Sequence, residues 1–344
     1  MSETTLLLQT QPPIASVSQL VAAEANEAGG AQLQEVIAII TGSTGAAALD
    51  QGGLVAHRHR TYLRSVLVFV KPHIDVTFVL VGLTGSLLAW HGAGRFPLIP
   101  ALLVVGSVGM LSAGAECCTN IRDRDIDSVM VRTARRPLVT GQISVHQAVL
   151  LATALTVVGL ALALALGPVP FFFLAFALVS NVVVYSLITK RATPWSIVLG
   201  SVVGPLTLWA GYTAVREPVS SAAWLLGGMV GVWVFVHIWV IAVRYRDDYA
   251  RGGVPMAPLV WPRPALATAL AASALAMAAL AVGAVLQLGG PAGRWGAIPV
   301  GLLSALIVVG AVQVPWRRRL AGPLIRVITI YLVLVLGVAI ACAL

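Results

Sequence analysis

Long apolar runs recur from residue 74 to the end of the chain, and they limit the fold more than any other feature of the sequence. An α-helix needs about 20 apolar residues to cross the hydrocarbon core of a bilayer, and each run approaches that length. Ten-residue segments of alternating polarity, which would indicate a membrane β-barrel, are absent from the sequence. We predict an all-α, multi-pass membrane protein with about nine spans: 74–91, 97–116, 145–165, 169–188, 196–213, 223–243, 264–287, 295–314 and 322–343.

Composition supports this class. Hydrophobic residues make up 58% of the chain and charged residues only 10%, whereas about a quarter of the residues in a soluble domain are charged. Residues 1–60 differ from the rest because they are polar and rich in Gly, Ala and Gln. They show neither a signal-peptide nor a transit-peptide pattern. We predict that residues 1–60 form a mobile extension and residues 61–344 the membrane domain.

Basic residues predict the orientation. Most of the 22 Lys and Arg residues precede the first span or follow an even-numbered span. Because such residues are retained in the cytoplasm, the N-terminus and these loops are predicted to be cytoplasmic, with a bacterial plasma membrane as the expected location. Topology also explains the net charge of +9, so nucleic acid is not an expected partner. The three cysteines have no metal-ligand spacing.

Two clusters of carboxylates follow spans on the same predicted side. Asp123, Asp125 and Asp127 follow the second span, and Asp247 and Asp248 follow the sixth. Like charges this close repel each other, which indicates a cation between them. Oxygen ligands without Cys or several His favour Mg²⁺, which proteins hold with one or two carboxylates plus substrate phosphates.

Helical spacing sharpens this prediction. If the second helix continues, Asn120, Asp123 and Asp127 share one face. Asp125 then points away and is expected to pair with Arg122 or Arg124. In the second cluster, His237 lies on the face of Arg244 and Asp248, about three turns deeper.

Neighbouring bases indicate a phosphate ligand, since guanidinium groups bind phosphate oxygens in pairs. These bases are Arg132, Arg135, Arg136, Lys190, Arg191, Arg244 and Arg246. A solvated network of ion pairs without any ligand is the alternative. Two clusters on one side, each with bases, favour a metal–diphosphate site.

Two segments resemble the aspartate motifs of UbiA-type prenyltransferases, most closely the heme O synthase (protoheme IX farnesyltransferase) branch. The first runs from Asn120 to Gly141 and contains DRDID and RPL; the second runs from Arg244 to Pro258. Shorter matches are Lys71-Pro72, Tyr185 with Lys190 to Thr193, and Ile330 to Leu332. The resemblance covers roughly residues 65–344.

This resemblance implies helices around a central cavity and farnesyl transfer from farnesyl diphosphate to protoheme. It implies that Asn120, Asp123 and Asp127 hold one Mg²⁺ and that Asp247 or Asp248 holds a second. The implied catalytic residues are Asp123, Asp127, Asp247, Asp248, Arg132 and Arg136. The implied substrate-binding residues are Lys71, Asn120, Tyr185, Lys190, Arg191, His237 and Arg244. His237 is expected either to orient or ligate heme or to hydrogen-bond another helix.

Other functions stay open. Val234 and Val236 depart from the family pattern just before His237, so the acceptor is an aromatic or other lipophilic molecule in one alternative. In another, the enzyme cyclises its own prenyl diphosphate. A secondary transporter is a third alternative, although transporter sites usually lie near the bilayer midplane. The sequence does not indicate an oligomeric state.

Labelling from each side of the membrane tests the topology. Single cysteines placed at Ser128 and Gly252 are expected to react with a membrane-impermeant thiol reagent only from the cytoplasm. A cysteine placed at Ala292 is expected to react only from the opposite side. If Ser128 and Ala292 were labelled from the same side, the number of spans between them would be wrong.

Overall fold

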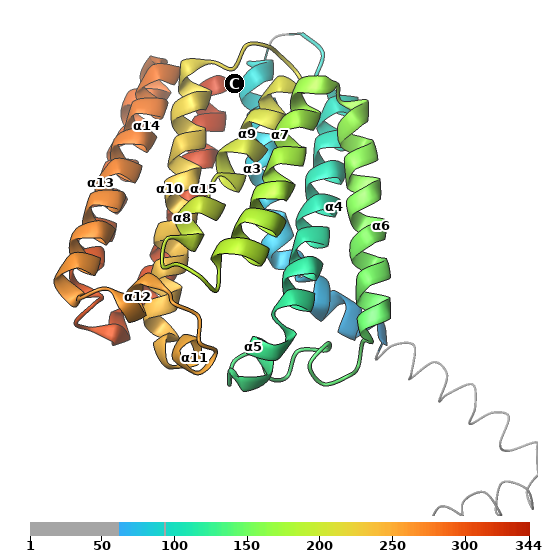
Figure 1. Ribbon diagram of the computed structural model, residues 1–344. Helices are drawn as coiled ribbons and strands as arrows, with labels where there is room; N and C mark the ends of the chain where they lie inside the picture. Colours follow the sequence, from blue (N-terminus) through green and yellow to red (C-terminus); the bar gives the residue numbers. More distant parts are fainter. Residues whose placement is uncertain (1–61, 93) are drawn as a thin grey trace, which may run out of the picture. The chain divides into compact units, whose positions relative to one another are not determined.

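The computed structural model describes residues 62–92 and 94–344, and every regular element in these ranges is a helix (Figure 1). The predicted extension at residues 1–60 lies outside the described ranges. The elements are α3 (Pro72–Trp90), α4 (Leu98–Arg122), α5 (Arg124–Val129), α6 (Val145–Ala165), α7 (Pro168–Val179), the π-helix η1 (Ser180–Thr189), α8 (Ser196–Gly200), α9 (Val203–Thr213), α10 (Ser221–Arg244), α11 (Arg246–Arg251), α12 (Ala257–Val260), α13 (Arg263–Leu288), α14 (Gly290–Gln313), the 3₁₀ turn η2 (Arg318–Leu320) and α15 (Ala321–Ala343).

The predicted spans are confirmed. Eight helical segments of the described chain are long and apolar enough to cross a membrane. A ninth is a bent pair, Tyr62–Val70 and Ile74–Trp90, whose two parts meet at 51°. Lys71 occupies the bend in a left-handed conformation, with φ 58° and ψ 58°, and Pro72 begins α3. Proline suits this first helical position because its missing N–H has no intrahelical partner there.

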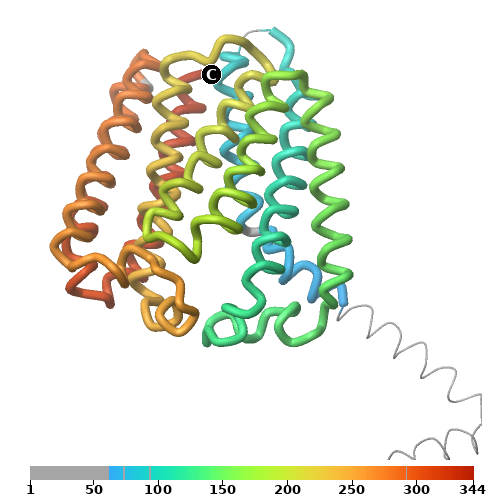
Figure 2. Tube along the Cα trace, viewed as in Figure 1, coloured from blue at the N-terminus to red at the C-terminus, as the bar shows by residue number. Residues whose placement is uncertain are grey.

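The helices run side by side, and the short helices α5 and α11 lie at the same end of the bundle (Figures 1 and 2). These short helices carry the two aspartate clusters. The C-terminus lies at the opposite end. The fold therefore places both clusters at one boundary of the spanning helices, as the apolar pattern predicts.

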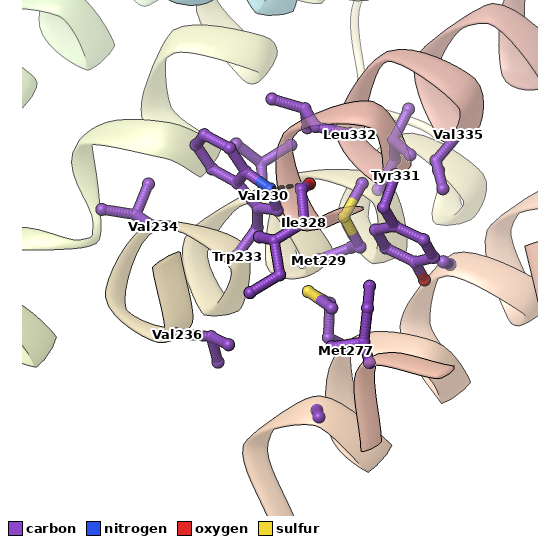
Figure 3. Close-up of a cluster of buried hydrophobic side chains, with 14 of the residues drawn as sticks. Met229, Val230, Trp233, Val234, Val236, Met277, Ile328, Tyr331, Leu332 and Val335 are labelled. Carbon is purple, nitrogen blue, oxygen red and sulfur yellow. Dashed lines mark hydrogen bonds between the residues drawn. The ribbon is translucent and has the colours of Figure 1, made fainter. Parts of the chain in front are cut away.

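Helix α10 packs against α9, α13 and α15 and forms the centre of the largest apolar cluster. Figure 3 shows Met229, Trp233, Met277 and Tyr331 in this cluster. The indole Nε1 of Trp233 donates a 2.8 Å hydrogen bond to the carbonyl of Ile328 on α15. Because no water satisfies polar groups in the hydrocarbon core, this bond supports the contact between α10 and α15.

Glycines allow α3 and α9 to approach closely. A methyl group on Gly211 would lie 1.8 Å from the carbonyl oxygen of Gly82, and one on Gly85 would lie 2.1 Å from that of Leu208. Ser86 donates a 2.9 Å hydrogen bond to the carbonyl of Gly211 across the same contact. Small residues permit such backbone approach between membrane helices.

The variant Gly211→Ala is expected to destabilise the bundle by about 2 kcal/mol or more, because the added methyl group must separate α3 from α9. Thermal unfolding in detergent measures this change. Gly301→Ala is the matched control, since a Cβ at Gly301 would have no neighbour within 4 Å. Equal melting temperatures for the two variants would contradict the close contact.

Candidate functional site

The first aspartate cluster lies where α4 ends and α5 begins. Helix α4 ends at Arg122, and Asp123 interrupts the helix with φ −93° and ψ 5°. Asn120, Asp123 and Asp127 are nevertheless all buried, and the guanidinium of Arg136 contacts both Asn120 and Asp127. These three side chains converge on the end of the bundle that also holds the second cluster.

The predicted partner of Asp125 is wrong. Its side chain points outward, with 66% exposed, but it binds Arg191 rather than Arg122 or Arg124. Arg191 donates two 2.7 Å hydrogen bonds to the carboxylate and a third to the carbonyl of Arg122. The hydrogen bonds from Arg191 lower the pKa of Asp125 to about 2. Local helical spacing could not show this pair, because Arg191 follows a different span.

Basic side chains neutralise the buried carboxylates. Lys190 forms an ion pair with Asp123, and Arg136 forms one with Asp127. Arg136 also donates a 3.2 Å hydrogen bond to Asn120 Oδ1, to which Lys71 donates at 2.9 Å. Burial alone would lower the pKa of Lys190, but its interactions with the Tyr185 phenol and the Asp123 carboxylate outweigh burial and raise the pKa.

The π-helix η1 supplies Tyr185 and positions Lys190. The amide of Lys190 donates a 2.9 Å hydrogen bond to the carbonyl of Tyr185, five residues earlier. The Lys190 ammonium lies 5.5 Å from the centroid of the Tyr185 ring, within the range of a cation–π contact. π-Helical segments are rare and frequently occur at functional sites.

Asp247 and Asp248 point in different directions. Asp248 is buried and accepts hydrogen bonds from the backbone amides of Val131, at 3.1 Å, and Arg132, at 3.3 Å. It also forms an ion pair with Arg251. Burial alone would raise the pKa of Asp248, but Arg251 and the two amides outweigh it and lower the pKa. Asp248 therefore joins the second aspartate loop to the first.

Asp247 and Arg244 lie on the side of the second aspartate loop that faces Arg318 and α15, away from the first loop. Asp247 is 66% exposed and pairs with Arg318 at 2.8 Å. Arg318 also donates to the carbonyl of Arg244, whose guanidinium lies against Gly322 of α15. The ring of Tyr245 lies between the loops, with Arg132 5.1 Å and Arg244 5.5 Å from its centroid.

His237 lies inside α10 and stacks on Trp233, with 4.9 Å between ring centroids and 16° between planes. Its Nδ1 atom is buried without a hydrogen-bond partner. In the described ranges, no hydrogen bond joins His237 to a neighbouring helix. The structure therefore does not support the alternative in which His237 only links two helices by a hydrogen bond.

A small cavity lies among the first-cluster residues. Its lining includes Lys71, Asn120, Asp127 and Arg136. Lys71 also binds a residue that the sequence analysis did not assign, Glu116, at 2.7 Å. The available signal was a carboxylate in an apolar span, one helical turn before Asn120.

The donor set fits Mg²⁺. In the described chain, no three His, Cys, Asp or Glu residues lie close enough to form a complete metal site. However, Asp123 Oδ1 is buried without a partner, so one carboxylate oxygen beside Asn120 and Asp127 has a free coordination position. This is the arrangement expected when phosphate oxygens and water complete the coordination shell.

The profile of the UbiA prenyltransferase family matches residues 77–342. The chain is 38% identical over 192 residues to the protoheme IX farnesyltransferase of Thermoplasma volcanium, and 39% identical over 189 residues to that of Thermoplasma acidophilum. Each match covers 55% of this chain and 66% of the relative. The chain therefore spans just under two thirds of the length of these two curated relatives.

Solved structures share the fold. A UbiA homolog from Archaeoglobus fulgidus, bound to GPP and Mg²⁺, superimposes with a TM-score of 0.59 at 18% identity, over 80% of this chain and 99% of that one. A digeranylgeranylglyceryl phosphate synthase has a TM-score of 0.63 at 18% identity, over 82% of this chain and 98% of that one. At these identities the likeness establishes the helical fold alone.

The different surroundings of Asp248 and Asp247 give a direct test. Asp248→Asn is expected to weaken the contact between the loops and raise the hydrogen-exchange rates of the Val131 and Arg132 amides by about tenfold or more, since charge-assisted hydrogen bonds contribute about 1.5–3 kcal/mol. Asp247→Asn removes the same charge from an exposed position and is expected to leave these rates unchanged. Equal exchange in both variants would contradict the role of Asp248.

Proposed function

Because the chain belongs to the UbiA prenyltransferase family, we propose that it is a magnesium-dependent enzyme that transfers a farnesyl group from farnesyl diphosphate to protoheme and forms heme O. The observation that carries this proposal is the cluster of buried carboxylates and bases at one end of an apolar bundle. The matches to protoheme IX farnesyltransferases support the choice of acceptor. The membrane is proposed to be a bacterial plasma membrane, with both aspartate loops facing the cytoplasm.

Asn120, Asp123 and Asp127 would hold one Mg²⁺, and Asp248 or Asp247 a second. When bound, magnesium neutralises charge on the diphosphate leaving group. Ion pairs hold Lys190 and Arg136 at the first-cluster carboxylates, so both bases are positioned to donate hydrogen bonds to diphosphate oxygens. Arg132 and Arg191 extend this basic surface at the mouth of the site. The apolar bundle excludes water from the allylic carbon.

On the acceptor side, His237 is the proposed heme-orienting residue because its imidazole is held by Trp233 and its buried Nδ1 has no partner. The vinyl group of protoheme would supply the electron pair for the new bond to C1 of the donor. The resulting cation would add water and lose a proton, which gives a hydroxyethylfarnesyl side chain.

A second candidate is prenyl transfer to another lipophilic acceptor. Val234 and Val236 are buried directly before His237, where the family pattern has Gln and Pro. These substitutions change the surroundings of the proposed acceptor residue and leave the donor site intact. Transport is less well supported, because the carboxylates lie at one end of the bundle (Figure 1) rather than at its middle.

Purified protein with Mg²⁺, farnesyl diphosphate and heme is expected to form a product with the mass of heme O. Asp123→Ala or Asp127→Ala is expected to lower kcat by about 10²-fold or more, because each change removes stabilisation of the leaving group. Glu217→Ala is the matched control, since Glu217 is exposed between α9 and α10 at the other end of the bundle. Near-normal turnover by Asp123→Ala would contradict the proposed donor site.

His237→Ala discriminates between the acceptors. If imidazole binds heme, this variant is expected to weaken heme affinity by about tenfold and shift the Soret band. Farnesyl diphosphate affinity is expected to stay unchanged, because His237 lies seven residues, about 10 Å of helix rise, from the end of α10 at Arg244. An unchanged Soret spectrum in a folded variant would exclude His237 as a heme ligand and favour another acceptor.

A further inference from the structure

Glu116 is a carboxylate inside a membrane-spanning helix that the proposed mechanism does not yet use. It lies in α4, one turn deeper than Asn120. Only 24% of its side chain is exposed, and Oε2 accepts a 2.7 Å hydrogen bond from Lys71. Charged side chains within spanning segments are costly and usually have a functional role.

Glu116 lines a second, larger cavity between α3, α4, α7, η1 and α9. Away from Glu116 the lining is mainly apolar, with Phe78, Val108, Leu111 and Leu174 among its residues. Val108 precedes Glu116 by eight residues of α4, so the cavity extends about 12 Å along this helix. Its elongated, apolar form suits a hydrocarbon chain.

The Lys71–Glu116 ion pair joins the linings of the two cavities. Lys71 belongs to the polar cavity with Asn120, Asp127 and Arg136, whereas Glu116 belongs to the apolar one. Lys71 also adopts a left-handed backbone conformation at φ 58°. Such conformations are costly for residues other than glycine and cluster at functional sites. The Lys71–Glu116 ion pair thus lies at the boundary between the polar cavity and the apolar cavity.

We propose that the prenyl chain of the donor occupies the larger cavity, so that its allylic carbon C1 lies beside Glu116 and the carboxylate stabilises the positive charge that develops there. This inference rests on the function proposed above. In a prenyl diphosphate, C1 joins the charged head to the apolar chain. With the head among the bases and the chain in the apolar cavity, C1 must lie at the boundary where Lys71 meets Glu116.

The step at C1 needs only the donor and the acceptor, and the cation left on the acceptor then adds water and loses a proton as described above. The C1–O bond breaks, and its electron pair leaves with the diphosphate. Positive charge then spreads over the allylic carbons until the π electrons of the acceptor form the new C–C bond. Glu116 exchanges no proton in this step. Its carboxylate acts through its fixed charge, which is more effective in a site of low dielectric than in water.

Glu116→Gln keeps the shape of the side chain and removes its charge. We expect kcat with farnesyl diphosphate to fall about 10²-fold, while the Kd of the unreactive analogue farnesyl thiolodiphosphate changes less than twofold. Glu116→Asp should recover part of kcat. Glu217→Gln, an exposed change between α9 and α10 at the other end of the bundle, is the matched control and should behave like the unchanged protein.

Filling the cavity gives an independent measurement if Glu116→Gln does not fold. Ala177→Phe places a ring in the cavity and is expected to raise kcat/KM for geranyl diphosphate relative to farnesyl diphosphate by about tenfold or more. Ala161→Phe, on the exposed face of α6, is its matched control. An unchanged ratio in Ala177→Phe would overturn the placement of the chain.

The outcomes separate this inference from the proposed function. If the unchanged protein turns over no prenyl diphosphate, both fail. If the protein is active but Glu116→Gln retains normal kcat, only the inference fails. It also fails if the analogue loses as much affinity as kcat/KM declines, because Glu116 would then act only by holding Lys71.

Discussion

Buried carboxylates at the end of a membrane bundle need positive charge beside them, and the arrangement of the site follows from this requirement. Asp123, Asp127 and Asp248 are each buried and each paired with a basic side chain. An unpaired charge in such surroundings would be strongly unfavourable. Lys190 and Arg136 come from the end of η1 and the loop after α5, so their ion pairs bring these two segments to the first cluster. Arg251 neutralises Asp248 from within the same helix, α11. The same bases are then available for an anionic substrate.

The bundle determines where these charges can meet. Close contact between α3 and α9 at Gly211, and the central packing of α10, hold the helices that carry the two loops. Asp248 adds a direct link, since it accepts hydrogen bonds from backbone amides more than 100 residues away in sequence. A charged mouth and an apolar interior are thereby joined at the Lys71–Glu116 pair. This division corresponds to the two parts of a prenyl diphosphate.

Sequence patterns predicted the spans well because hydrophobic length is a local property of the chain. The burial of Asn120, Asp123 and Asp127 close together was also predictable, since the Asp127 amide still donates a hydrogen bond to the Asp123 carbonyl across the interruption. The pairing of Asp125 with Arg191 and the divergence of Asp247 from Asp248 depend on how distant spans pack, so neighbouring residues carried no signal for them. Glu116 was missed for a different reason: it lies outside the two aspartate motifs, and its importance depends on a cavity formed by five helical elements.

The central claim is that the carboxylate–base cluster is a magnesium-dependent diphosphate site. Titration calorimetry with farnesyl thiolodiphosphate tests it directly, with the same protein in Mg²⁺ and in EDTA. Without the metal, the carboxylates already occupy the bases and repel the diphosphate, so the account predicts binding weaker by at least about tenfold, or about 1.4 kcal/mol. Equal affinity under the two conditions would contradict the account.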